Sequence, residues 1–300
     1  MFPTDKRLKL VQTYFFVCEQ YESNLQFLCE RFSNNKNPEF TDQEAMTIYL
    51  FAMNVERRFQ IKEIYCFAKD YLIDWFPKLP SYATFSDRIN RLNEAFKALA
   101  FFIISTFIPE GCSKFYALID SLPIITCSGK RKAKVALEIT DKGFCSTKSM
   151  YYYGLKLHAL AHYHAGRLPH PDMLLLSKAS ENDLTCLKPI ALRLQNRLLF
   201  GDKIYGFEEF WNDRKKQNNV DMLTPIKDVK GQLEVEKQRN KAFNELFSTA
   251  VSKIRQPIES LFNWLIEKTN IQKASKVRST KGLLTFVFGR IAAAYINLIY

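Results

Sequence analysis

The spacing of apolar residues divides the chain into a helical first third and a mixed remainder. Over residues 6–107, apolar positions recur mostly every three or four residues, which is the period of an amphipathic helix. Thr41, followed three residues later by Glu44, forms a capping-box pattern that predicts the start of a helix. A polar turn is expected over 33–38, and the two prolines of FPKLP (76–80) predict an interruption between helices.

From residue 111 onward the pattern changes to short apolar runs bounded by glycine, proline or charged residues, which predict strands. The expected strands are 114–120, 154–164, 173–179, 197–202 and 221–226. A helix is expected over 182–194, and from about residue 234 the helical spacing returns. Three strands, a helix, a strand and then helices indicate α/β layers rather than a barrel or a sandwich.

The chain is therefore expected to have a helical region over 1–110 and an α/β domain over 111–300. The helical region could contain a helix-turn-helix or could be a plain bundle, because periodicity does not separate the two. The net charge of +12 belongs to the second part: residues 1–110 hold 13 Lys/Arg against 14 Asp/Glu, whereas 111–300 hold 30 against 17. Such a basic domain favours a polyanionic partner such as nucleic acid, with a basic enzyme that binds none as the alternative.

The composition also excludes several classes of protein. The seven cysteines include no Cys-x-x-Cys pair, so neither a disulfide framework nor a zinc ribbon is indicated, and a reducing cytoplasm is expected. No signal peptide is expected, since the first residues carry charges without a long apolar stretch after them. The most apolar segments, 99–108 and 283–300, are expected to be core helices. The first is shorter than the roughly 20 residues of a membrane span, and the second contains Arg290.

Two aspartates each follow a buried apolar run. Asp120 comes directly after Tyr-Ala-Leu-Ile, and Asp202 follows Leu-Leu-Phe-Gly. Ligands of open α/β sheets bind at the carboxyl ends of the strands, so the two carboxylates converge if their strands are neighbours. Close carboxylates repel unless a cation lies between them, and their oxygen atoms suit Mg²⁺ or Mn²⁺.

A third acidic candidate, Glu259, lies on the helix expected over 253–268. Apolar residues along this helix form a stripe that would dock on the sheet, and Glu259 lies beside that stripe. Pro257 suits a first helical turn, which places Glu259 close to the start of the helix. Glu267, the other acidic residue nearby, lies in a polar helix end and is expected to be solvated.

Each of these residues also has an ordinary structural interpretation. A lone aspartate at a strand end commonly serves as a turn or cap residue, and Arg255 with Glu259 has the spacing of a surface ion pair. The rival metal hypothesis is a zinc site built on His158, His162, His164 and His170. It lacks cysteine partners at ligand spacing, and its strand pattern is not a usual zinc arrangement. The joint order of Asp, Asp and Glu inside a basic α/β domain favours a shared carboxylate site.

That order resembles the DDE transposases with a ribonuclease-H-like fold, and the whole chain looks most like bacterial transposases of the insertion sequence 982 family. The matching segments, which span most of the chain, are TDQEAMTIYLF (41–51), FPKLPSYATFSDRINRL (76–92), IDSLPI (119–124), YYYGLKLHAL (151–160), LLFGDKIY (198–205) and RQPIESLFNWL (255–265). The chain departs from related transposases at Ser252 and Leu265, where they often carry tyrosine and lysine.

The resemblance implies a ribonuclease-H-like mixed sheet flanked by helices, preceded by an all-helical, DNA-binding N-terminal region. It implies that Asp120, Asp202 and Glu259 are the catalytic triad and hold two Mg²⁺ ions, with Mn²⁺ as a substitute. The candidate DNA contacts are Arg131, Lys156, His158, Lys203 and Arg255.

The resemblance also implies the activity of a DNA transposase. Two-metal sites suit this activity, since they activate a water or hydroxyl for in-line attack at phosphorus. The enzyme would cut the ends of an insertion sequence and join each 3′-OH to target DNA. A nuclease of the same fold that does not join DNA, and a non-catalytic DNA-binding regulator derived from a transposase, remain alternatives. The expected partner is DNA, both transposon ends and target, and a homodimer is expected because two ends must meet. No membrane association is expected, and the location would be the bacterial cytoplasm, at the nucleoid.

Overall fold

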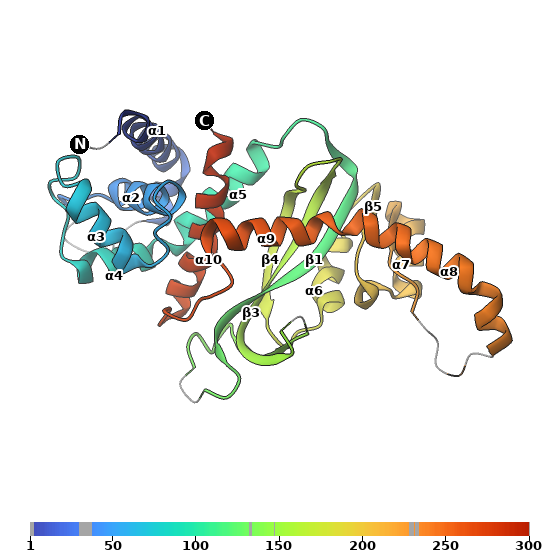
Figure 1. Cartoon of the computed structure of the whole chain (residues 1–300). Coiled ribbons are helices and arrows are strands. Elements are labelled where there is room, and N and C mark those ends of the chain that lie inside the picture. Colours follow the sequence, from blue (N-terminus) through green and yellow to red (C-terminus); the bar gives the residue numbers. More distant parts are fainter. Residues whose placement is uncertain are drawn as a thin grey trace.

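The computed structural model describes residues 3–29, 38–131, 134–146, 148–227, 231 and 234–299. A group of helices built from both chain ends lies on one side of a curled sheet, and a long helix projects from the other side (Figure 1). Residues 33–37 of the expected polar turn fall outside the described residues.

The N-terminal region is helical, as its periodicity predicts. Its helices are α1 (Thr4–Gln20), α2 (Asp42–Asn54), α3 (Ile61–Tyr71), α4 (Tyr82–Arg91) and α5 (Asn93–Thr106), with short turns η1 (Tyr21–Leu25) and η2 (Gln26–Leu28) after α1. The predicted capping box at the start of α2 is confirmed: Glu44 donates its backbone N–H to the Thr41 hydroxyl and accepts the Thr41 N–H on its carboxylate. The FPKLP segment separates α3 from α4, also as expected.

The C-terminal helix α10 (Thr280–Tyr295) returns to this helical region and shares its core. It packs on α5 and α2, and a short turn, η4 (Ile296–Leu298), follows it. The expectation of core helices at 99–108 and 283–300 is confirmed, because α5 and α10 contribute many fully buried side chains. No helix among the described residues combines the length and apolar character needed to cross a bilayer.

Buried Arg290 of α10 ties the helical region to the second part of the chain. Its guanidinium donates to the carbonyl oxygens of Phe59, before α3, and Thr269, which lies at the end of the preceding helix. It also stacks 3.9 Å from the ring centroid of Phe286. A guanidinium that is 4% exposed requires such partners, since an unpaired buried charge is costly.

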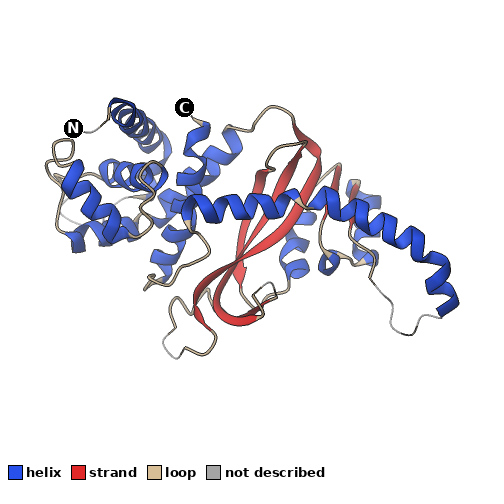
Figure 2. Ribbon diagram, viewed as in Figure 1, coloured by secondary structure: helices blue, strands red, loops and turns tan. Residues whose placement is uncertain are grey.

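The sheet has six strands: β1 (Cys112–Ser128), β2 (Asp141–Cys145), β3 (Met150–His164), β4 (His170–Lys178), β5 (Arg197–Phe200) and β6 (Val220–Leu223). The strand order is β2-β3-β1-β5-β6, with β4 also paired to β3. The pairs among β1 to β4 are antiparallel, whereas β5 and β6 run parallel to β1 (Figure 2). This mixed sheet flanked by helices confirms the ribonuclease-H-like fold.

The sequence pattern missed β2 and shortened β1. Strand β2 alternates exposed and buried residues over only five positions, so it contains no apolar run. Strand β1 was expected to end at Asp120 but continues to Ser128, because beyond the carboxylate its apolar residues still pair with β3.

Alternate residues of β1 enter two different cores. Leu118 and Leu122 point to the face covered by α9 (Pro257–Thr269), while Ala117 and Ile119 point to the face covered by α6 (Asp183–Ala191). The remaining elements are η3 (Lys203–Tyr205) and α7 (Glu208–Asn218), which follow β5, and α8 (Glu234–Arg255), which runs into α9. The two faces matter for the site, because a side chain on one face cannot reach the other.

Candidate active site at the carboxyl edge of the sheet

The parallel register of β1 and β5 brings Asp120 and Asp202 to the same level. Leu118 pairs with Phe200 at the end of this ladder, and each aspartate lies two residues further along its own strand. Because side chains alternate with a period of two, the aspartates project to the same face as the paired residues before them. Asp120 therefore lies within β1 but at the end of its pairing with β5, and the two carboxylates become neighbours.

Asp202 has a structural role as well. It precedes η3, and its Oδ1 accepts the backbone N–H of Lys203 at 2.7 Å. Its side chain is exposed. The local interpretation of Asp202 as a cap is thus correct, and it is compatible with a second role because the side chain remains accessible.

Glu259 is the third residue of α9, which has Pro257 at its start. Arg255, the last residue of α8, connects it to the strand carboxylate: Nη2 donates to Oε1 of Glu259 at 2.7 Å, and Nη1 donates to Oδ2 of Asp120 at 2.8 Å. The predicted Arg255–Glu259 pair exists, but it is part of a three-residue bridge rather than an isolated surface ion pair. The bend between α8 and α9 therefore brings a helix glutamate to the carboxylate of β1.

The three acidic residues lie within each other's electrostatic field. Burial, opposed by the N–H of Ser121 and by Arg255, raises the pKa of the Asp120 carboxyl to about 6. The negative charges of Asp202 and Glu259 also raise it. A carboxylate that is disfavoured by burial and by two like charges is stabilised when a further cation comes close.

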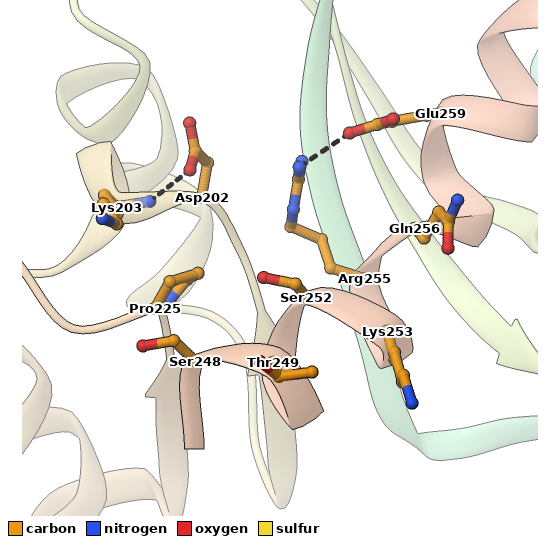
Figure 3. A pocket seen from close by; sticks show the side chains of 10 residues that line it. All are labelled: Asp202, Lys203, Pro225, Ser248, Thr249, Ser252, Lys253, Arg255, Gln256 and Glu259. Carbon is orange, nitrogen blue, oxygen red and sulfur yellow. Dashed lines mark hydrogen bonds and ion pairs between the residues drawn. The ribbon is translucent and has the colours of Figure 1, made fainter. Parts of the chain in front are cut away.

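Asp202 and Glu259 border an open pocket of about 550 Å³, and Asp120 lies behind Arg255, which also lines it. Figure 3 shows Asp202 and Lys203 on one side and Arg255 with Glu259 on the other, while the side chains of α8 form the wall between them. The lining residues are Asp202, Lys203, Pro225, Ser248, Thr249, Ser252, Lys253, Arg255, Gln256 and Glu259. Apart from Arg255 and Ser252, the sequence did not single out the residues that α8 contributes, although their hydroxyl and basic side chains suit a phosphate group.

The donor set fits a hard divalent cation, since the three acidic residues offer carboxylate oxygens. In the part of the chain that the structure describes, however, no three His, Cys, Asp or Glu side chains are arranged to share a metal ion. Arg255 lies between Asp120 and Glu259 and pairs with both. These two carboxylates therefore already face one positive charge, which is the electrostatic environment that a metal ion would provide.

The candidate DNA contacts are distributed over three places. Lys203 and Arg255 line the pocket. Arg131 is exposed beyond the end of β1. Lys156 and His158 lie on the face of the sheet that α6 covers, because His158 pairs with Ser121 in the register of β1 and β3. The last two are thus on the opposite face from Asp120.

On that opposite face, Asp183 at the start of α6 organises a polar network that the sequence did not reveal. It accepts Lys156 Nζ at 2.7 Å on Oδ1 and the Ser121 hydroxyl at 3.0 Å on Oδ2. Since Ser121 directly follows Asp120, this network fixes the part of β1 that carries the candidate catalytic carboxylate. His158 is 4% exposed and hydrogen-bonds the Ser177 hydroxyl at 2.8 Å, so its burial lowers the pKa of the imidazole.

Each of the four histidines has a hydrogen-bond partner within the protein. Besides the Ser177 contact, their partners are the Ser113 carbonyl for His162, the Cys112 sulfur for His164 and the Ile104 carbonyl for His170. They form no metal-holding cluster among the described residues. The two departures from related transposases also differ in place: Ser252 lines the pocket, whereas Leu265 is buried in the core.

A mixed sheet of antiparallel strands extended by two parallel ones, with helices on both faces and carboxylates at its carboxyl edge, defines a ribonuclease-H-like protein. Residues 117–296 match the family model of the transposase DDE domain, and the chain belongs to that family. Membership implies a DNA substrate and a divalent metal ion as cofactor. Comparisons with curated proteins and with solved structures gave no match.

Proposed function

We propose that this protein is a transposase of the insertion sequence 982 type, which cuts the ends of its element and joins the freed 3′-OH to target DNA. The observation that carries the proposal is that Asp120 of β1, Asp202 after β5 and Glu259 of α9 lie close together. Asp202 and Glu259 line one pocket, and Arg255 joins Glu259 to Asp120. Carboxylates gathered from distant segments repel one another and lower the stability of the fold. Such arrangements are typical of functional sites.

In the proposed site, Asp120, Asp202 and Glu259 would hold two Mg²⁺ ions through their carboxylate oxygens. When bound, the ions would activate the attacking water or 3′-OH and stabilise the leaving oxygen. Lys203 lies next to Asp202 on the pocket wall, where its ammonium can bind a DNA phosphate.

Arg255 has two roles in this proposal. Without metal it neutralises Asp120 and Glu259, at 2.8 and 2.7 Å. The positive charge of Arg255 thereby reduces the repulsion among the three carboxylates before DNA binds. Arg255 also lines the pocket, where its guanidinium would contact a DNA phosphate.

The proposal is tested with a labelled duplex that carries the DNA flanking the chain's own gene. With Mg²⁺, the full chain is expected to release the labelled end and to produce a longer, joined product with a target plasmid. Chelation of the divalent ions should abolish both products but leave DNA binding measurable, because the basic surface does not depend on metal. Cleavage without joining would identify a nuclease instead, and binding without cleavage would identify a regulator.

We further propose that residues 1–110 bind the transposon ends while residues 111–300 carry out the chemistry. The helical region lies at one end of α9 and α8 extends from the other end (Figure 1), so the helical region would bind DNA away from the pocket that α8 lines. Deletion of this region is a poor test, because α10 packs into its core.

Two ends must be brought together, so we propose a homodimer in which α8 meets its copy. The helix projects from the body (Figure 1) and exposes 79% of Val235, 66% of Phe243 and 73% of Leu246. An isolated helix is marginal in water unless an apolar face is covered. Over 234–246 three glutamates balance three basic residues, so this part complements a second protein helix better than a phosphate backbone.

Leu246→Glu is therefore expected to convert a dimer into a monomer of 35.0 kDa without unfolding the chain. The measurement is the mass by light scattering after size exclusion. The matched control is Leu192→Glu, which changes an exposed leucine away from α8 and should leave the dimer intact. A wild-type monomer at micromolar concentration would contradict this interface.

A further inference from the structure

The hairpin formed by β2 and β3 carries an exposed surface of aromatic and basic side chains. Along β2, Lys142 and Phe144 are exposed, while Gly143 and Cys145, which each follow one of them, are buried. Along β3, Tyr151 is exposed and the next residue is buried. One face of the hairpin therefore packs on the protein, and the other presents its side chains to solvent.

The exposed face is organised rather than random. Phe144 pairs with Tyr151 in the register of the hairpin, and their ring centroids lie 5.0 Å apart. Lys142 Nζ lies 4.9 Å from the centroid of the Tyr151 ring, and Lys134 Nζ lies 4.3 Å from that of Tyr153. Such contacts fix the lysines over the rings while leaving their ammonium groups accessible. Phe144 and Tyr151 remain 52% and 58% exposed, which is unusual for rings without a ligand or partner.

A second segment of the chain lies beside the hairpin. Between α9 and α10, the backbone at Lys273 runs parallel to Ile125 of β1: Ile125 donates its N–H to Gln272 and accepts the N–H of Ala274. Lys148 at the hairpin turn donates to the Gln272 side chain, which joins the two segments. We define the hairpin surface as Lys134, Lys142, Phe144, Tyr151 and Tyr153. Lys273 is not part of it, because its bridge with Ile125 places it on the opposite face of the sheet.

The hairpin surface lies on the same face of the sheet as the candidate active site. Ala159 of β3 pairs with Asp120, and paired residues share a face. Tyr153 and Tyr151 lie six and eight residues before Ala159, so alternation places them on that face. At a rise of about 3.3 Å per residue, the separation along the strand is roughly 20–26 Å. At about 3.4 Å per base pair, this corresponds to roughly six to eight base pairs of duplex DNA.

We infer that the hairpin surface binds the DNA duplex that flanks the cut phosphate, roughly six to eight base pairs away from it. The lysines contact phosphates, and the exposed rings pack against sugars and bases. The charge favours DNA over an acidic protein because Lys134 and Lys142 share one face of the sheet with the basic side chains of the pocket. The two nearby acidic side chains are engaged elsewhere: Asp141 accepts from Ser180, and Glu138 accepts from Thr280. This inference deepens the proposed function and rests on it.

Two double variants of the full chain separate the contributions of charge and rings. Lys142→Gln with Lys134→Gln should weaken binding to a 30-base-pair duplex and lower the salt slope of the binding constant by about two, because each phosphate contact contributes about 0.9. Phe144→Ser with Tyr151→Ser should weaken binding about tenfold without changing that slope. Binding is measured by fluorescence anisotropy over a salt series without divalent ions, so that no DNA is cut.

The matched control is Lys188→Gln. Lys188 of α6 also lies over aromatic rings, at 4.9 Å from Phe207 and 5.4 Å from Phe210, but on the opposite face of the sheet. It should bind DNA like the wild type. An equal loss in this control would show that only overall charge matters and would overturn the inference.

Unchanged affinity and slope in both double variants would overturn the hairpin surface while leaving wild-type cleavage, and so the proposed function, intact. Conversely, a wild type that binds DNA through this surface but never cuts would leave the surface standing and remove the proposed catalysis. Equal loss of polyglutamate binding in the lysine variant, with no effect of the ring variant on DNA, would identify a general anion site instead.

Discussion

Asp202→Asn is expected to lower strand cleavage by about three orders of magnitude or more and to leave DNA binding intact. Asparagine can still cap η3 through its side-chain oxygen, so the fold around Lys203 is preserved. The lost negative charge removes a metal ligand, and metal stabilisation of a transition state is worth several kcal/mol, at about 1.4 kcal/mol per factor of ten. Single-turnover cleavage of a labelled end measures the effect.

The matched control for this change is Asp221→Asn. Asp221 also belongs to a strand of the parallel ladder, but it pairs with Leu198 and forms an ion pair with Lys215 at 2.6 Å, away from the pocket. Cleavage by this variant should stay within a factor of two or three of the wild type, since its loss is that of an exposed ion pair. Normal cleavage by Asp202→Asn would remove the residue from the proposed triad.

Arg290→Leu is expected to lower the free energy of unfolding by about 3–5 kcal/mol, which is the usual cost of removing one partner of a buried charged contact. The carbonyl oxygens of Phe59 and Thr269 would lose their donor in a dry environment. Each unsatisfied buried carbonyl costs about 1–3 kcal/mol. Urea denaturation followed by circular dichroism measures the change in midpoint.

Arg193→Leu provides the comparison for this stability change. Arg193 is exposed after α6, and its replacement should change the unfolding free energy by less than about 0.5 kcal/mol. If Arg290→Leu were as stable as this control, the guanidinium would not be an important link between α10 and the rest of the helical core.

Most elements could be predicted because their signals are local. The capping box at Thr41 and the apolar run before Asp202 each depend on neighbours in sequence, and both predictions are confirmed. The ends of β1 and the existence of β2 could not be predicted from the same signals. Their backbones are stabilised by pairing with β3, which is distant in sequence, rather than by an apolar run of their own.

The candidate site shows the same difference between features that depend on local sequence and features that depend on distant segments. The family resemblance made Lys156 and His158 candidate DNA contacts, together with Lys203 and Arg255 near the acidic residues. The register decides otherwise, since one residue of shift along β3 moves a side chain to the other face. Asp183, which engages Lys156 and Ser121, could not be recognised because its partners lie on two other elements.

The sequence by itself determined the helical first third, the basic α/β remainder and the identity and order of the acidic residues, because composition and short-range periodicity are properties of the chain. Only the tertiary structure decided that Asp120 and Asp202 lie at one level of neighbouring strands and that Arg255 lies between two carboxylates. It also decided that the aromatic face of the hairpin shares their side of the sheet. The physical reason is that register and helix docking are set by packing and hydrogen bonds between distant segments, which no single segment encodes.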